Sequence, residues 1–233
     1  MSGLILALSV APGGEHDGTW LVPLLQRAKK LYAHIREVLT DAASGGIRLR
    51  QEAERSTGVK VIAPPVATSR KGGGLGKDDF GIDFQSMTAT CPGGVITATW
   101  KLTRNAGEEV PTFVWEQGSE ADCPCRDACP VHRPGKSKSG RPGAPKRRLQ
   151  LHPQEEALRA VREEWKRPEV RTRYRRRTEG ERLMREATRR GARRAGGWGL
   201  DNASLQAHIA VGVSNLLVLA RHLAARQPER HAA

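Results

Sequence analysis

The sequence predicts an α/β fold that is interrupted by a β-rich, cysteine-containing insertion and followed by a helical C-terminal part. Three observations support this prediction. Residues 4–63 alternate short apolar runs with amphipathic segments in the order strand, helix, strand, helix, strand, which is the pattern of an α/β domain. Short alternating runs and four cysteines occupy residues 68–132. From residue 153 to about 228 the spacing of apolar residues is helical again.

Residues 1–67 are expected to form a partial α/β core. The apolar run 4–10 predicts a buried strand, which is closed by an Ala-Pro-Gly-Gly turn. Thr19 is the expected cap of the first helix, whose apolar stripe comprises Leu21, Leu24, Leu25, Ala28 and Leu31. The remaining elements expected here are a strand over 35–41, a short helix over 47–54 and a strand over 59–63.

The rest of the chain divides by composition. Residues 82–100 carry two alternating runs with a Cys-Pro-Gly-Gly turn between them, and a third run follows at 112–115. Residues 133–152 are rich in Pro, Gly, Ser and Lys and predict a basic, solvated linker. Three helices are expected in the last part: one that ends at Pro168, an Arg-rich one from 169 to about 190, and one capped by Asp201. In the last helix the apolar residues Leu205, Ile209, Val213, Leu216, Ala220 and Leu223 recur at helical spacing.

The positive charge is concentrated in one segment. The 233 residues include 39 Lys and Arg against 25 Asp and Glu, a net charge of +14. Residues 133–194 hold 22 of these basic residues and only 8 acidic ones, so this segment accounts for the whole excess. A basic block of this kind indicates a polyanionic partner, most often nucleic acid. Aromatic residues make up only 4%, which argues against a stacking platform for single strands.

No apolar run in the sequence is long enough to predict a membrane span. The most apolar run, 209–220, has twelve residues and includes Ser214 and Asn215, whereas about twenty apolar residues are needed. The N-terminus lacks the basic region of a secretory signal, so we expect a cytoplasmic protein without disulfides.

Arginine clusters in the last part exceed what solubility requires. They predict contacts with phosphate groups that are largely independent of DNA sequence, and the alternative is a solvated charged face. The candidate DNA-binding residues are Arg175, Arg176, Arg177, Arg189, Arg190, Arg193 and Arg194.

The cysteines suggest one structural zinc ion held by four thiolates. The candidate ligands are Cys91, Cys123, Cys125 and Cys129, with His132 as a possible substitute for one thiol. Their spacing is irregular compared with two Cys-x₂-Cys knuckles, and the alternative is free cysteines in a loop.

Two acidic residues are candidates for metal chemistry. Asp41 ends a predicted strand, where α/β sheets collect ligands, although such an aspartate is more often a turn or cap residue. Glu179 shares a helix face with Leu183 and Ala187, so we expect it to be half-buried. In one interpretation, an ion pair with Arg175 compensates the charge of the Glu179 carboxylate. In the other, Glu179 and Asp41 together hold Mg²⁺ beside a phosphodiester.

These residues together resemble the DDE transposases of insertion sequences. The similarity lies in residues 4–17 with their Glu-His-Asp, in Val38–Ala42, in Arg175–Gly180, and in the segments 191–195, 199–200 and 214–216. The cysteine insertion between Asp41 and Glu179 is similar to that of the subgroup with a zinc-ribbon-like insertion. The resemblance implies an incomplete RNase H-like core, strand cleavage and transfer that depend on Mg²⁺ (or Mn²⁺), and oligomeric assembly on DNA.

The resemblance also implies catalytic roles for two residues and the absence of a third catalytic acid. Asp41 would be the second catalytic acid and Glu179 the third, while the first has no counterpart here. Ala43-Ser44 replaces the usual aromatic turn, and Glu186 stands where a basic residue is common, with Arg185 nearest to it. We therefore expect a truncated transposase that is inactive alone, binds DNA, and associates with itself or an intact transposase. The alternative is a non-catalytic, zinc-stabilised nucleic-acid-binding protein.

Overall fold

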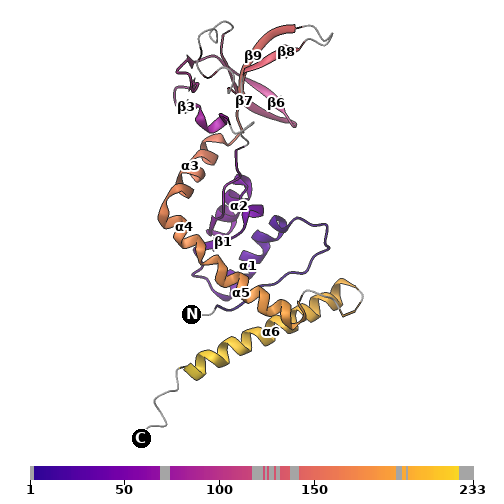
Figure 1. Ribbon diagram of the computed structural model, residues 1–233. Helices are drawn as coiled ribbons and strands as arrows, with labels where there is room; N and C mark the ends of the chain where they lie inside the picture. The colour runs from indigo at the N-terminus through magenta and orange to yellow at the C-terminus, as the bar shows by residue number, and fades with distance from the viewer. Residues whose placement is uncertain are drawn as a thin grey trace. The chain divides into compact units, whose positions relative to one another are not determined.

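The computed structural model describes residues 3–68, 74–116, 123, 125, 129, 132–136, 142–192, 196–197 and 199–225, with the backbone alone described for 132–136 and 142–146. The chain forms two compact units (Figure 1). The first unit combines residues 1–65 with residues 164–233, and the second comprises residues 66–163.

The first unit contains the predicted α/β alternation. Its two strands pair in parallel, with Val38 opposite Val61. Two helices pack with them in a core of Leu21, Leu25, Ala53, Val59, Val61 and Ala63. The elements are η1 (Asp17–Trp20), α1 (Leu21–Leu31), β1 (Glu37–Leu39), η2 (Ala42–Ser44), α2 (Ile47–Thr57) and β2 (Lys60–Ile62). The side chain of His16, not that of Thr19, caps the first turn by accepting from the Gly18 N–H.

The predicted strand at residues 4–10 is wrong. These residues adopt no regular secondary structure, and Leu4 and Leu6 are about 40% exposed. The Asn215 side chain bonds both backbone groups of Ile5, and Arg27 donates to the Leu8 carbonyl at 3.3 Å. A strand requires a neighbouring strand for its backbone N–H and C=O groups. Among the described residues, only side chains take that place.

The helical part of the first unit is more broken than its sequence pattern suggests. The predicted Arg-rich helix is divided into α4 (Pro168–Arg175) and α5 (Arg177–Ala187), followed by a π-helical turn, η5 (Thr188–Ala192). Gly191 has φ 97°, a left-handed conformation that ends the helical path. Glu164 pairs with Lys60 at the start of β2, and Arg173 pairs with Glu37 at the start of β1, 2.6 Å apart. The helical path is thus fastened at the amino ends of both strands.

The last helix, α6 (Leu200–Ala225), packs on α5 and η5. Its buried residues are Ala207, Ala210, Val211 and Ser214, whereas the predicted apolar stripe is largely exposed: Leu205, Ile209, Leu216 and Leu223 are 58–66% exposed. Asp201 lies in its first turn instead of capping it. The helix is longer than the twelve-residue apolar run, and by length and composition alone it would suffice to cross a membrane. The core helices of soluble proteins can have the same length and composition.

The second unit is β-rich. Its core contains Phe80, Phe113, Trp115, Leu149 and Leu151 together with Cys91 and Cys129. One sheet orders β3 (Gly81–Asp83), β4 (Thr88–Thr90) and β5 (Ile96–Thr97), with the predicted turn at residues 91–94 between the last two. The other orders β6 (Trp100–Asn105), β7 (Glu108–Val114), β9 (Pro142–Gln150) and β8 (His132–Lys136).

The segment 133–152 therefore does not form a linker in the structure. Most of it lies in β8 and β9, and Phe113 pairs with Leu149 across the sheet. Arg147 is only 3% exposed and lies 5.9 Å from the Trp115 ring centroid, so this arginine is part of the core instead of a solvated tract.

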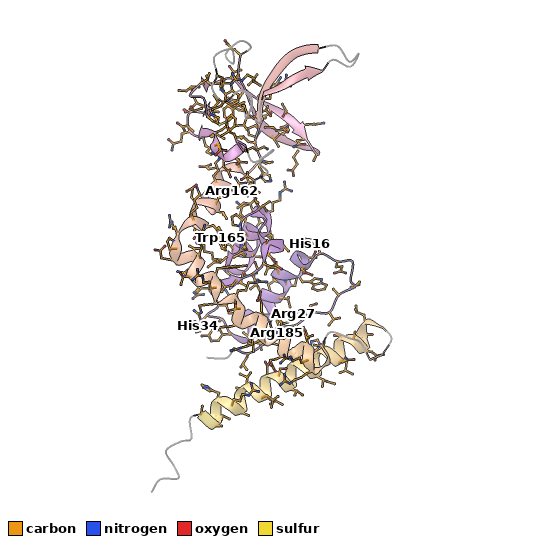
Figure 2. The ribbon with its side chains drawn as sticks, in the orientation of Figure 1. His16, Arg27, His34, Arg162, Trp165 and Arg185 are labelled. Carbon is orange, nitrogen blue, oxygen red and sulfur yellow. The ribbon has the colours of Figure 1, made fainter. Side chains whose placement is uncertain are left out.

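The helix α3 (Glu155–Lys166) begins in the second unit, where its arginines bond the short turn η4 (Lys77–Asp79). Arg159 donates to the carbonyls of Lys77 and Phe80 at 2.9 and 2.8 Å. Arg162, labelled in Figure 2, reaches the Asp78 carboxylate at 2.7 Å.

Candidate functional site

Asp41 lies two residues after the carboxyl-side end of β1, near the strand end where the sequence predicts it. Its side chain is exposed, and one carboxylate oxygen accepts a hydrogen bond from the Ala43 N–H at 3.1 Å, so Asp41 is the cap of η2. This cap fixes the direction of the carboxylate and leaves its other oxygen without a described hydrogen bond. Asp41 thus caps the turn with one carboxylate oxygen and leaves the other oxygen available to a ligand.

The loop after Asp41 is held tightly against the end of β2. Gly45 is buried, and a Cβ atom at this position would lie 2.4 Å from the Pro64 carbonyl oxygen. Arg50 of α2 donates to the carbonyls of Gly45, Val61 and Ala63 at 2.9, 2.9 and 2.6 Å. Burial lowers the pKa of Arg50, and the charge of Glu164 acts in the opposite direction. Asp41 therefore lies at the start of a loop that Arg50 and the close contact at Gly45 hold in place.

A second aspartate lies in a neighbouring turn. The η1 turn, which begins at Asp17, packs against η2, and Gly18 is buried beside Leu49 of α2. Asp17 and His16 are both exposed, and His16 is labelled in Figure 2. The two turns place the backbones of the Asp17 and Asp41 segments close together.

Glu179 lies in the first turn of α5 and is exposed, so the predicted half-buried position is wrong. Its helix face does pack further along, because Ala187 is buried and Leu183 is partly buried. The expected ion pair with Arg175 does not form, and Glu179 makes no salt bridge to any other residue that the structure describes. Nothing on α5 therefore neutralises this carboxylate.

The two acids do not complete a metal site by themselves. Within the described residues, no group of three or more His, Cys, Asp or Glu is placed to hold a metal ion. The contacts that fasten the helices to the sheet lie at the amino ends of the strands, whereas Asp41 follows the other end of β1. Asp41 and Glu179 have the oxygen donors that a divalent cation prefers, but the described part of the chain does not gather them with a third carboxylate.

The candidate DNA-binding arginines fall into two groups. Arg175 and Arg176 are exposed and form no ion pair with a described residue. The others compensate nearby acids: Arg177 pairs with Glu181 at 2.7 Å, and Arg190 and Arg189 lie 2.8 and 3.7 Å from Glu186. Arg193 and Arg194 lie outside the described residues.

The four cysteines are free and only partly gathered. A Cβ atom at Gly93 would lie 2.7 Å from the Cys123 sulfur and 3.7 Å from the Cys91 sulfur, so both thiols approach this turn. Cys91 also accepts from the Val95 N–H at 3.4 Å, and Cys129 is buried in the same core. Cys125 is partly exposed. The predicted four-thiolate group is not assembled among the described residues.

Comparison with known proteins then identifies the class. The family model of the transposase DDE domain matches residues 90–220. This match covers more than half of the chain, and the chain belongs to that family. No curated protein and no solved structure gives a significant match.

The matched range includes the four cysteines, α5 with Glu179, and most of α6, but it begins after Asp41. The assignment of Asp41 as a catalytic acid consequently stays a prediction from its motif and position. Sequence reasoning missed two basic residues, Arg182 and Arg221, which the fold brings to one pocket. They are 39 positions apart on different helices, and no local pattern links them.

Proposed function

We propose that this chain is a DNA-transposition protein that binds DNA through α4 and α5 and contributes two carboxylates, Asp41 and Glu179, to a transposase active site. The family match over the helix of Glu179 is the observation that carries this proposal. The unpaired side chains of Arg175 and Arg176 support it, because exposed guanidinium groups without acidic partners bind phosphate groups well. The cytoplasm is the expected place of action.

DDE transposase domains use divalent metal ions, which activate the attacking oxygen and stabilise the leaving one. In this chain the described carboxylates do not form a complete ligand set. We therefore propose that the chain alone does not cleave DNA, and that its own residues hold and orient the DNA backbone. A complete site requires a third carboxylate near Asp41 and Glu179, supplied for example by an intact transposase that associates with this chain.

DNA binding tests the first part of the proposal. A duplex of arbitrary sequence should bind with a steep salt dependence, because each phosphate contact contributes about 0.9 to the slope of log K against log salt concentration. Arg175→Gln/Arg176→Gln should reduce that slope by about 2, and Arg36→Gln/Arg104→Gln, which removes two exposed charges elsewhere, should leave it nearly unchanged. Absence of DNA binding, or binding insensitive to salt, would contradict the proposal.

Nicking of supercoiled DNA in the presence of Mg²⁺ tests the second part. We expect no nicking by the chain alone, and nicking that depends on Asp41 and Glu179 once the missing carboxylate is supplied. If the chain nicks DNA unaided, the statement about the incomplete site is wrong. Loss of that activity in Asp17→Asn would then identify Asp17, in the turn beside η2, as the completing acid.

A second candidate function is a non-catalytic nucleic-acid-binding protein stabilised by zinc. The approach of the Cys91 and Cys123 sulfurs to Gly93 favours it. Metal analysis of the purified chain should then give about one zinc per chain, and a chelator should unfold the second unit. Zinc-free protein that a chelator does not change would exclude this candidate without affecting the DNA-binding proposal.

A further inference from the structure

A basic pocket lies between α5 and α6 in the first unit. Its volume is about 230 Å³. The α5 side and the following π-turn contribute Arg182, Leu183, Glu186 and Arg190, and α6 contributes Ser214, Leu217, Val218 and Arg221. Three guanidinium groups and one carboxylate thus line a single cavity.

The carboxylate in this pocket is already neutralised. Arg190 donates to Glu186 at 2.8 Å and Arg189 lies 3.7 Å away. The hydrogen bond from Arg190, together with the charges of Arg190, Arg189 and Arg221, lowers the pKa of Glu186. Arg182 and Arg221 form no hydrogen bond or ion pair with a described residue. With three arginines and one glutamate in its lining, the pocket therefore carries an excess of positive charge.

The remaining lining shows which ligand would fit. Leu183, Leu217 and Val218 are apolar, and the Ser214 hydroxyl already donates to the Ala210 carbonyl at 2.8 Å. Polar recognition must consequently come from the guanidinium groups, which suit the oxygens of a phosphate group. Apolar side chains in the same lining suit the sugar edge of a nucleotide better than a free inorganic ion.

The pocket lies on the face of α5 that carries Glu179. Arg182, Leu183 and Glu186 follow Glu179 by three, four and seven positions, which is one face of a helix. At 1.5 Å per residue, the pocket begins about 5 Å along the helix axis from Glu179. A DNA strand that passes Glu179 would bring a phosphate into the pocket.

We propose that Arg182 and Arg221 form a subsite for a phosphodiester group of DNA, next to the position of Glu179. The inference rests on the proposed function, because it takes DNA as the ligand. It goes further by assigning two residues outside the arginine clusters, one on each helix, to a single phosphate. The subsite exists only when α6 packs on α5.

The test is binding of a fluorescent DNA duplex at several salt concentrations. Arg182→Gln/Arg221→Gln should raise Kd about tenfold and lower the salt slope by about 1, since one phosphate contact is lost. Arg182→Lys/Arg221→Lys should keep the slope but bind more weakly than wild type, because ammonium groups cannot form the paired hydrogen bonds of guanidinium. Arg36→Gln/Arg104→Gln, with the same charge removed, is the control. Unchanged thermal unfolding of each variant shows that folding is intact.

Failure of the inference can be separated from failure of the proposed function. If wild type does not bind DNA, both are overturned. If wild type binds DNA and Arg182→Gln/Arg221→Gln binds equally well with the same slope, only the subsite is overturned. Binding to vesicles of anionic phospholipid that depends on Arg182 and Arg221, with DNA binding unaffected, would also overturn it and assign the pocket to a lipid headgroup.

Discussion

Asn215 bonds both backbone groups of Ile5. The Ile5 N–H donates to the Asn215 Oδ1 atom at 2.9 Å, and the Asn215 Nδ2 atom donates to the Ile5 carbonyl at 2.9 Å. The amide side chain thereby provides the pair of bonds that a neighbouring strand would give. The contact joins residues 210 positions apart in the sequence.

Asn215→Ala should release the N-terminal segment. Two partly buried hydrogen bonds are lost, so the free energy of unfolding should fall by about 1–2 kcal/mol. Hydrogen exchange in residues 3–10 should become faster than in wild type. Leu216→Ala changes the next residue of α6, which is 66% exposed, and should leave that exchange unchanged. Equal exchange in wild type and Asn215→Ala would show that the bonds do not hold the segment.

Gly45→Ala should destabilise the loop that carries Asp41. The new methyl group would lie 2.4 Å from the Pro64 carbonyl oxygen and 2.9 Å from that of Ala42, so backbone must move, at a cost of about 1–3 kcal/mol. Gly46→Ala is the matched control, because no atom lies within 4 Å of a Cβ atom there. Urea unfolding of both variants gives the comparison, and equal midpoints would contradict the close approach.

Arg50→Met should cost more than a typical surface substitution. It leaves the carbonyls of Gly45, Val61 and Ala63 without their donor, and we expect a loss of about 3 kcal/mol in chemical denaturation. Arg55→Met, on the same helix, breaks only an exposed pair with Glu52 and should cost less than about 0.5 kcal/mol. Similar losses in the two variants would mean that the Arg50 bonds contribute little.

Glu186 should titrate with a pKa below its usual value near 4.5. The hydrogen bond from Arg190 favours the ionised form, so the stabilisation is complete above the unfolded pKa and disappears as the pH falls through the lower folded pKa. NMR titration of the side chain should show this shift and its reversal in Arg190→Gln. Arg185→Gln, which removes an exposed neighbour labelled in Figure 2, should leave it in place. A pKa of Glu186 near 4.5 in wild type would contradict the predicted effect of the Arg190 hydrogen bond.

The elements that the sequence predicted correctly are those that local patterns determine. The helix after Gly46 and the Cys91–Gly94 turn depend on residues that are close along the chain. The family resemblance was also readable, because it depends on the order of several short motifs, and the family model confirms it.

The errors arise where distant residues decide the structure. An apolar run such as residues 4–10 has the composition of a strand, but its neighbours determine whether it pairs. The composition of residues 133–152 predicted a linker, yet Leu149 pairs with Phe113 across the sheet. Glu179 shares the face of Leu183 and Ala187, but burial on this face increases only toward Ala187, and Glu179 in the first turn is exposed. No spacing in the sequence indicates that Arg182 and Arg221 line the same pocket.

The division of the chain into units has a kinetic consequence during synthesis. The second unit is continuous in sequence, whereas the first must join residues 1–65 to residues 164–233. At about 5–20 residues per second, a ribosome needs about 10–40 s to make the 210 residues between Ile5 and Asn215. The β-rich unit can therefore fold first, while the apolar N-terminal segment waits, exposed to chaperones and to other nascent chains, until the final helix emerges.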